Sequence, residues 1–94
     1  MIFDPEKREL TALLRRLPDS GQCRVLEIGC GDGRLTRRYA THVNRILAID
    51  PDEALTTAFR ADGVDANVDL RTMAVDRLEL ADASVDAVLF SWAL

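Results

Sequence analysis

Apolar residues recur at helical spacing in three segments of the chain. In the first, Leu10, Leu13, Leu14 and Leu17 stand at positions i, i+3, i+4 and i+7. Asp4-Pro5 precedes them as a pair that favours the start of a helix. In the last, Leu55, Ala58 and Phe59 are predicted to face inward, and Gly63 is predicted to end the helix. Each segment has one apolar side, so each is predicted to pack as an amphipathic helix. The segments are 4–17, 34–42 and 52–62.

Short apolar runs lie between and after these segments and predict strands. Arg24–Ile28, Arg45–Ile49 and Val85–Phe90 are largely apolar, as in strands covered on both faces. Val68–Met73 alternates apolar and polar residues, which suits a strand nearer the edge of a sheet. Strands that alternate with helices favour right-handed crossovers and a parallel sheet. We therefore expect an α/β fold, with a turn over residues 82–84 before the fourth strand.

The clearest local motif is VLEIGCGDG, residues 25–33, which ends a predicted strand and opens a helix. Its three glycines let the backbone turn tightly and let a ligand lie against it. The dinucleotide-binding fingerprint needs a glycine at the sixth place, where this chain has Arg34. Glu27, just before the loop, suits a cationic ligand better than a pyrophosphate. S-adenosylmethionine has an ammonium, a sulfonium and no phosphate, and it fits these features.

Asp50 follows Gly29 by 21 residues and ends the second predicted strand. A carboxylate at this spacing can accept hydrogen bonds from both ribose hydroxyls of a bound nucleoside. A simpler alternative is that the glycines only form a tight turn and Asp50 only caps a helix. The ordered series of strand, acid, glycines, helix, strand and acid favours the binding site.

These segments resemble class I S-adenosylmethionine-dependent methyltransferases, especially the type 11 group that acts on small molecules. VLEIGCGDGRLT is similar to the first motif of that family, ILAIDPD to the second, and LELADASVDAVLFSWAL to the stretch that enters the fourth strand. The resemblance implies a Rossmann-like parallel sheet with flanking helices, of whose seven strands the chain holds the first four. Residues 1–94 would then be the N-terminal, cofactor-binding part of a methyltransferase domain, truncated after the fourth strand.

The resemblance also implies which residues bind the methionine end of the cofactor. Glu27 would hold the ammonium, often through water, and the glycine loop would line the methionine and the ribose. Two residues where the fourth predicted strand ends would face the same end. The loop residues are Gly29, Cys30, Gly31 and Gly33, and the two later residues are Phe90 and Ser91.

For the nucleoside, the resemblance implies that Asp50 binds the ribose hydroxyls and that Pro51 packs on the adenine. The family's usual adenine-binding acid falls at Ala74, and Asp76 lies two places later. Adenine would therefore be bound either by Asp76 or by the backbone around Val75 together with apolar packing.

The reaction implied is methyl transfer from S-adenosylmethionine to a small-molecule acceptor. A formal net charge of -4 argues against nucleic acid or an acidic membrane surface as the main partner. The segment FSWAL also lacks the Asn/Asp-Pro-Pro-aromatic motif of methyltransferases that modify the amino groups of bases. No general base is predicted, because His42, the only histidine, falls at the end of a helix. Cys23 and Cys30 fit no zinc spacing and are expected to be reduced thiols of a cytoplasmic protein.

Two alternatives come from other classes of protein. One is a nicotinamide-dependent oxidoreductase, against which Arg34 and Glu27 count. The other is a non-catalytic fragment or binding module that keeps the methyltransferase-like half-fold. Because an apolar fourth strand would leave a sheet edge uncovered, the chain alone is expected to be poorly stable. It is also expected to be inactive, because the resemblance places most substrate contacts after the fourth strand. A dimer through that edge is the less favoured alternative.

Overall fold

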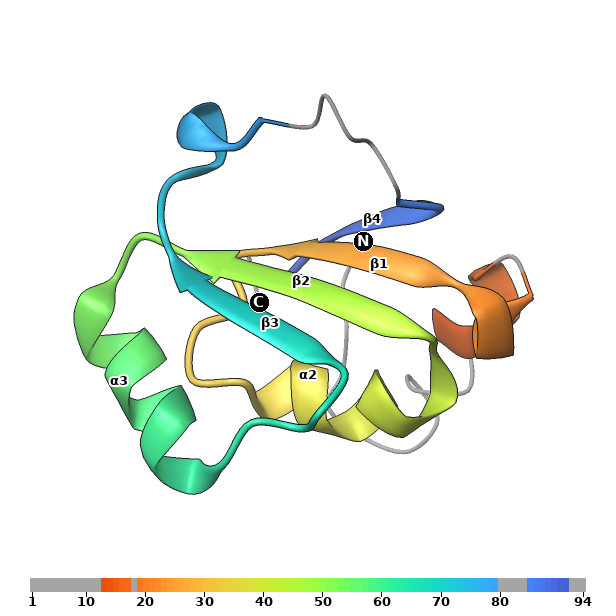
Figure 1. The fold of residues 1–94 in the computed structure, drawn as a ribbon, viewed down its shortest axis with the longest axis horizontal. Helices are drawn as coiled ribbons and strands as arrows, with labels where there is room; N and C mark the ends of the chain where they lie inside the picture. The colour runs from red at the N-terminus through yellow and green to blue at the C-terminus, as the bar shows by residue number, and fades with distance from the viewer. Residues whose placement is uncertain (1–12, 18, 80–84, 92–94) are drawn as a thin grey trace.

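A computed structural model describes residues 13–17, 19–79 and 85–91. Its centre is one sheet of four parallel strands in the order β3-β2-β1-β4 (Figure 1). The strands are β1 (Arg24–Ile28), β2 (Arg45–Asp50), β3 (Val68–Thr72) and β4 (Ala87–Phe90). This confirms the predicted α/β fold and its Rossmann-like arrangement, including the position of β3 at an edge.

The helices follow the predicted order along the chain. The crossovers from β1 to β2 and from β2 to β3 run in the same direction, so α2 and α3 cover the same face of the sheet (Figure 1). Residues 13–16 are helical, and the predicted start of that helix lies outside the described residues. The elements are α2 (Arg34–Tyr39), α3 (Glu53–Asp62) and the short 3-10 helices η1 (Ser20–Gln22), η2 (Ala40–His42) and η3 (Val75–Arg77).

Helix α3 is fixed at both ends by its own sequence. One carboxylate oxygen of Asp52 accepts hydrogen bonds from the amides of Ala54 at 2.9 Å and Leu55 at 3.3 Å. Gly63 ends the helix with φ of 98°, a backbone conformation that side chains with a Cβ rarely adopt. Asp52, not Asp50, is therefore the residue that caps α3.

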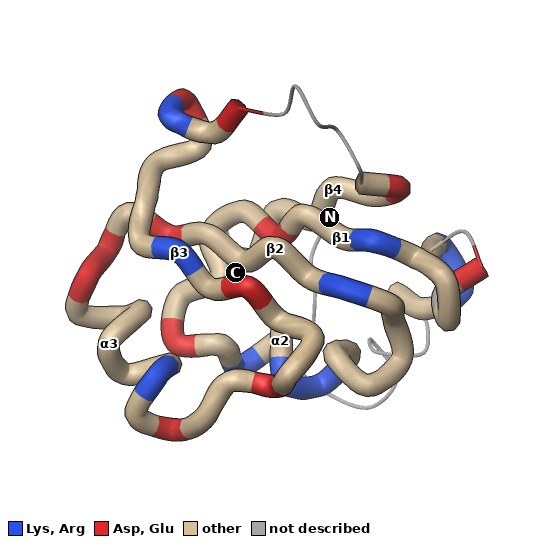
Figure 2. Tube along the Cα trace, viewed as in Figure 1, with Lys and Arg blue, Asp and Glu red and all other residues tan. Residues whose placement is uncertain are grey.

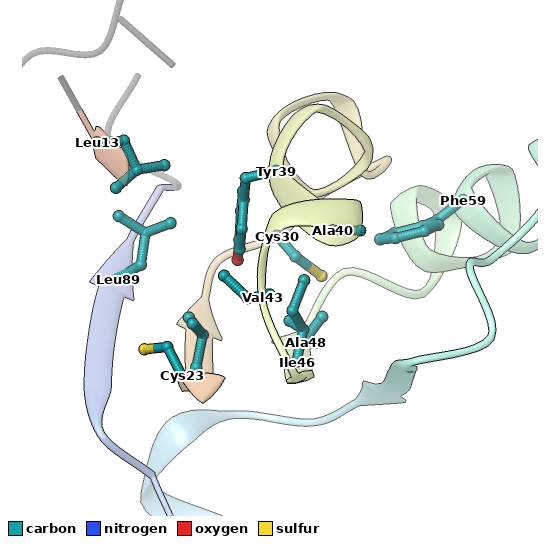
Figure 3. Packing of buried hydrophobic residues seen from close by; sticks show 11 residues of the cluster. Leu13, Cys23, Cys30, Tyr39, Ala40, Val43, Ile46, Ala48, Phe59 and Leu89 are labelled. Carbon is teal, nitrogen blue, oxygen red and sulfur yellow. The ribbon is translucent and has the colours of Figure 1, made fainter. Parts of the chain in front are cut away.

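The core lies between the sheet and the covering helices, where Tyr39 from α2 and Phe59 from α3 are almost completely buried (Figure 3). The prediction for α3 was only partly right, because Phe59 is buried whereas Leu55 and Ala58 are exposed. Thr56 and Phe59, which are three residues apart, form the side of the helix that faces the sheet. Leu55 instead lies near the glycine loop, with its Cδ1 3.8 Å from where a Cβ of Gly31 would be.

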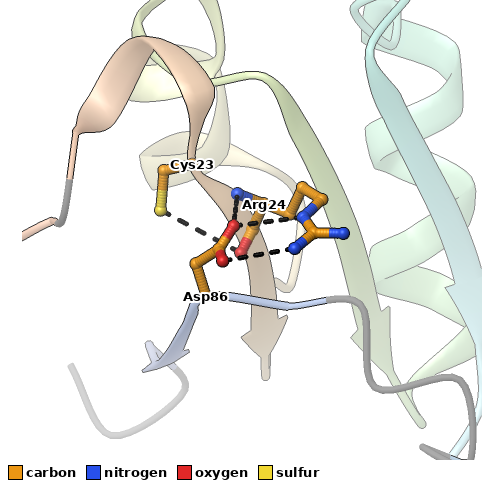
Figure 4. Close-up of polar contacts among 3 residues, drawn as sticks. All are labelled: Cys23, Arg24 and Asp86. Carbon is orange, nitrogen blue, oxygen red and sulfur yellow. Dashed lines mark hydrogen bonds and ion pairs between the residues drawn. The ribbon is translucent and has the colours of Figure 1, made fainter.

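Strand β4 begins at Ala87, later than predicted, and only one of its faces is covered. Leu89 is 8% exposed, whereas Val88 and Phe90 are 48% and 51% exposed. Because β4 is an outer strand of the described sheet, its exposed side chains agree with the expectation that an apolar fourth strand leaves part of the sheet uncovered. The start of the strand is held by Asp86, whose carboxylate accepts from the backbone amide of Arg24 at 2.9 Å and pairs with its guanidinium (Figure 4). The turn predicted over residues 82–84 lies outside the described residues.

Candidate functional site

The carboxyl ends of all four strands meet at one edge of the sheet, because the strands are parallel. Gly29, Pro51, Met73 and Ser91 directly follow β1, β2, β3 and β4 at this edge. In open α/β sheets, ligands bind beyond these ends, where the strand order reverses. Here the reversal lies between β1 and β4, so the segments after these strands are the first place to look for a site.

The loop after β1 is a left-handed backbone turn. Its glycines have φ of 80° at Gly29, 58° at Gly31 and 86° at Gly33. The amides of Gly29 and Cys30 both donate to the carbonyl of Ile49 in β2, at 2.8 and 3.1 Å. A Cβ on Gly33 would stand 2.7 Å from the ring of Phe59, so the third glycine serves the packing of α3 against the loop.

Asp50 ties this loop to the end of β2. One of its carboxylate oxygens accepts from the amide of Gly31 at 2.9 Å, and the other accepts from the amide of Asp52 at 2.8 Å. The residue is 6% exposed, and Pro51 beside it is exposed. Each carboxylate oxygen retains acceptor capacity beyond its single backbone partner. The structure therefore brings Asp50 and the glycine loop together, as the binding-site prediction requires.

Glu27 lies beneath the loop with no exposed surface. Oε1 accepts from the phenol of Tyr39 at 2.6 Å and from the hydroxyl of Thr36 at 2.8 Å. Oε2 lies 2.7 Å from Oγ of Ser91, which also lies 2.9 Å from the carbonyl oxygen of Gly29. Burial raises the pKa of the Glu27 carboxyl, and the hydrogen bonds from Tyr39, Ser91 and Thr36 oppose that rise.

Tyr39 and Thr36 are the site residues that sequence reasoning missed. Figure 3 shows the ring of Tyr39 reaching from α2 toward the sheet, and both residues are fully buried. Burial is the main cause that raises the pKa of Tyr39, followed by the nearby Glu27, so the phenol keeps its proton. The available signal in the sequence was a threonine and a tyrosine three residues apart on a helix, after a strand whose penultimate residue is a glutamate.

Among the remaining predicted site residues, Ser91 contacts the glycine loop at the carbonyl of Gly29. Val75 and Asp76 are exposed in η3, and no described hydrogen bond links Asp76 to the glycine loop. Phe90 and Ser91 are consecutive in an extended chain, so they point to opposite faces of the sheet. Only Ser91 reaches Glu27.

Neither cysteine has a partner that would suggest chemistry. Cys23 and Cys30 are both buried and free. Burial, followed by the charges of Glu27 and Asp50, raises the pKa of the Cys30 thiol to about 12. It therefore remains a thiol at neutral pH and is not an activated nucleophile.

The described part of the chain lacks both a metal-binding cluster and a membrane-spanning helix. Residues 13–17, 19–79 and 85–91 contain no group of three or more His, Cys, Asp or Glu side chains that could hold a metal ion. Within the same ranges, no helix is long and apolar enough to cross a membrane.

Comparison with known proteins agrees with this geometry. Residues 25–94 match the family described as a methyltransferase domain. An uncharacterised methyltransferase of Mycobacterium tuberculosis is 38% identical over 80 residues, which are 83% of this chain and 39% of that protein. Phosphoethanolamine N-methyltransferase 1 of wheat is 30% identical over 95 residues, covering 97% of this chain and 19% of its own length. The chain spans 32–39% of the first curated relatives that it matches.

A solved structure shows the same fold. It is an RNA methyltransferase from Salinibacter ruber in complex with S-adenosylhomocysteine, at a TM-score of 0.72 and 22% identity, covering 90% of this chain and 57% of that one. The family match extends over most of the chain, and the parallel sheet and the glycine loop are those that the sequence motifs predicted. The chain therefore belongs to the class I S-adenosylmethionine-dependent methyltransferase family.

Proposed function

We propose that the carboxyl edge of this sheet binds S-adenosylmethionine, and that the protein transfers the cofactor's methyl group to a small-molecule acceptor. The observation that carries the proposal is the hydrogen bond from the amide of Gly31 to Asp50. It holds a nearly buried carboxylate against a loop of left-handed glycines. A neutral nucleoside with a cationic amino-acid end matches such a site, since the acid can accept from ribose hydroxyls and the glycines permit close approach.

In this proposal the nucleoside lies on the β2 side of the edge. Asp50 accepts from the ribose hydroxyls with the acceptor capacity left by Gly31 and Asp52. Pro51, Leu55 and Val75 are exposed apolar side chains on the segments after β2 and β3, and they supply apolar surface for the adenine. Asp76 has no described hydrogen bond to the glycine loop, so it contributes less to cofactor binding than Asp50.

The methionine end lies over Gly29 and Ser91. When bound, the cofactor supplies a methyl group on a positively charged sulfur, ready for in-line displacement. The chain's residues bind and orient it: the glycine loop fixes the position, and Glu27 gives a negative potential beneath the ammonium. No described residue is assigned as the base that accepts a proton from the acceptor, and His42 is exposed at the opposite end of the strands.

The acceptor is proposed to be a small molecule. Support comes from the wheat relative, whose name specifies phosphoethanolamine, and from the net charge of -4. Figure 2 shows arginines interspersed with acidic residues along the traced chain. An RNA acceptor is the competing reading, favoured by the RNA methyltransferase that shares the fold. Methyl transfer from labelled cofactor to RNA, with none to metabolite extracts, would replace the small-molecule proposal.

Calorimetry with S-adenosylhomocysteine and NAD tests the cofactor. The expected result is saturable binding of S-adenosylhomocysteine and none of NAD. Tight NAD binding without a response to S-adenosylhomocysteine would contradict the proposal and favour an oxidoreductase. We also propose that residues 1–94 by themselves do not complete methyl transfer, since the chain spans about a third of its curated relatives. Turnover by this chain with any acceptor would refute that part.

A further inference from the structure

The hydrogen bonds around Glu27 can be counted proton by proton. Thr36 and Tyr39 each have one hydroxyl proton, and both give it to Oε1. Ser91 also has one hydroxyl proton, but its Oγ lies 2.7 Å from Oε2 of Glu27 and 2.9 Å from the carbonyl oxygen of Gly29. If Glu27 is ionised, both of these neighbours are acceptors, and a single proton must serve two of them.

A proton on Oε2 of Glu27 removes this shortage. Oε2 then donates to Oγ of Ser91, and Ser91 donates to the carbonyl of Gly29. Each of the four contacts then has its own proton, as expected for a fully satisfied buried network.

The surroundings of Glu27 also favour its neutral form. The described ion pairs of the chain join Arg24 with Asp86, Arg37 with Asp62 and Arg71 with Asp69, and none includes Glu27. The titratable group that contacts Glu27 is Tyr39 from α2, and Cys30 from the loop is close enough to interact with it electrostatically. Ser91, directly after β4, contributes a hydroxyl. None of these is a cation, and burial raises the pKa of the carboxyl.

We propose that Glu27 carries a proton in the free protein at a pH where exposed glutamates are ionised, and that binding of a cationic ligand at the glycine loop displaces this proton. The second half rests on the proposed function, with the ammonium of the cofactor as the cation. When the proton leaves Oε2 for solvent, Ser91 turns its hydroxyl to Glu27 and releases the carbonyl of Gly29. That carbonyl then accepts from the ammonium, and the new carboxylate balances the ammonium's charge.

Affinity for an ammonium-bearing ligand should therefore rise with pH. Below the pKa of Glu27 in the free protein, each pH unit is expected to tighten binding by up to about tenfold, with release of up to one proton per ligand. Calorimetry of S-adenosylhomocysteine between about pH 5 and 7, in buffers of different ionisation enthalpy, measures both quantities while the ligand's amine stays charged. As the control ligand, 5′-methylthioadenosine has the nucleoside and the thioether but no amino-acid end, and should bind without proton release.

Glu27→Gln is the matched variant, because its amide can donate to Ser91 as the protonated acid does. It should fold, and proton release and the pH dependence of affinity should disappear. Binding of S-adenosylhomocysteine without proton release by the unmodified protein would overturn the inference and leave the proposed function standing. Failure of both ligands to bind at any pH would overturn the proposed function and, with it, the displacement half of the inference.

The proton on Glu27 itself is tested without a ligand. The chain has five glutamates, so carboxyl-carbon NMR of glutamate-labelled protein follows each titration. The signal missing in Glu27→Gln should titrate at a higher pH than those of the exposed glutamates. Tyr39→Phe, which removes a donor to the ionised form, should move that titration higher still. A Glu27 signal that titrates together with the others would contradict the inference.

Discussion

Two segments at the carboxyl edge of the sheet differ in how firmly the fold holds them. Gly29–Gly33, after β1, is bonded to Ile49 and Asp50 of β2, and its third glycine packs against Phe59. The segment 73–79, after β3, joins β2 through one bond, from the amide of Met73 to the carbonyl of Asp50. Beyond that, its backbone bonds are its own, from Arg77 to Ala74 and from Leu78 to Val75.

This difference indicates which segment already has its binding geometry in the free protein and which segment a bound ligand would order. The loop after β1 has its geometry before any cofactor arrives, because left-handed glycines and neighbouring elements determine it. The segment after β3 has exposed side chains at Val75 and Asp76 and no side-chain cap. Preorganised groups lose less entropy on binding, so the loop and Asp50 should carry most of the cofactor affinity.

The largest effect is expected from Gly33→Ala. The added Cβ would stand 2.7 Å from the Phe59 ring, and the alanine would have to adopt the left-handed backbone conformation of Gly33. Overpacking and backbone strain should together lower the free energy of unfolding by about 2–4 kcal/mol. Gly63→Ala is the matched control, because its φ is 98° but nothing lies within 4 Å of the added Cβ. Urea unfolding measures both. Equal losses at the two positions would show that contact with Phe59 does not constrain the loop.

Asp50→Ala should weaken S-adenosylhomocysteine binding more than Asp76→Ala. Loss of the carboxylate that accepts hydrogen bonds from the ribose hydroxyls should cost about 1.5–3 kcal/mol of binding free energy. Because Asp50 also accepts from two backbone amides, binding is compared by calorimetry at temperatures where both variants remain folded. A loss of affinity in Asp76→Ala as large as that in Asp50→Ala would show that the segment after β3 contributes as much to cofactor binding as Asp50 does.

The third prediction concerns how stability depends on pH through Glu27. Its pKa is raised in the folded state, so its stabilising contribution is complete below the unfolded value of about 4.3. That contribution is lost as pH rises through the folded value. The stability of the unmodified protein relative to Glu27→Gln should therefore fall with increasing pH over this window, as followed by thermal unfolding. A rise with pH would mean that Glu27 is stabilised as a carboxylate.

The smallest effect is expected at the amino end of the same strands. Arg24 and Asp86 form an ion pair whose side chains are 46% and 35% exposed. Arg24 lowers the pKa of Asp86, so the pair stabilises the fold above the unfolded pKa of Asp86 and loses this effect as pH falls through the folded value. Asp86→Asn should have little effect on thermal unfolding, and less in high salt. A large, salt-independent loss would show that the backbone bond to Arg24 anchors β4.

The contrast between the two segments also marks how far sequence reasoning reached. The sequence predicted β1, the glycine loop, the position of Asp50 at the end of β2 and the end of α3 at Gly63. Each of these features depends on residues that are adjacent in the chain. The contact of Ser91 with Glu27 joins residues 64 positions apart, and its hydrogen-bond geometry cannot be predicted from local pattern. Leu55 was assigned to the wrong side of α3, since the rotation of a helix on a sheet depends on packing with the neighbouring loop.

The central claim is that the loop after β1 and Asp50 form the cofactor site. The most direct test follows the backbone amide signals of isotope-labelled protein by NMR during a titration with S-adenosylhomocysteine. Saturable shifts are predicted at Gly29, Gly31 and Asp52, the residues of the loop and of the Asp50 contacts. Arg24 and Asp86, at the opposite end of the strands, should stay unchanged. No saturable change at the loop, or shifts confined to other parts of the chain, would contradict the assignment of the site.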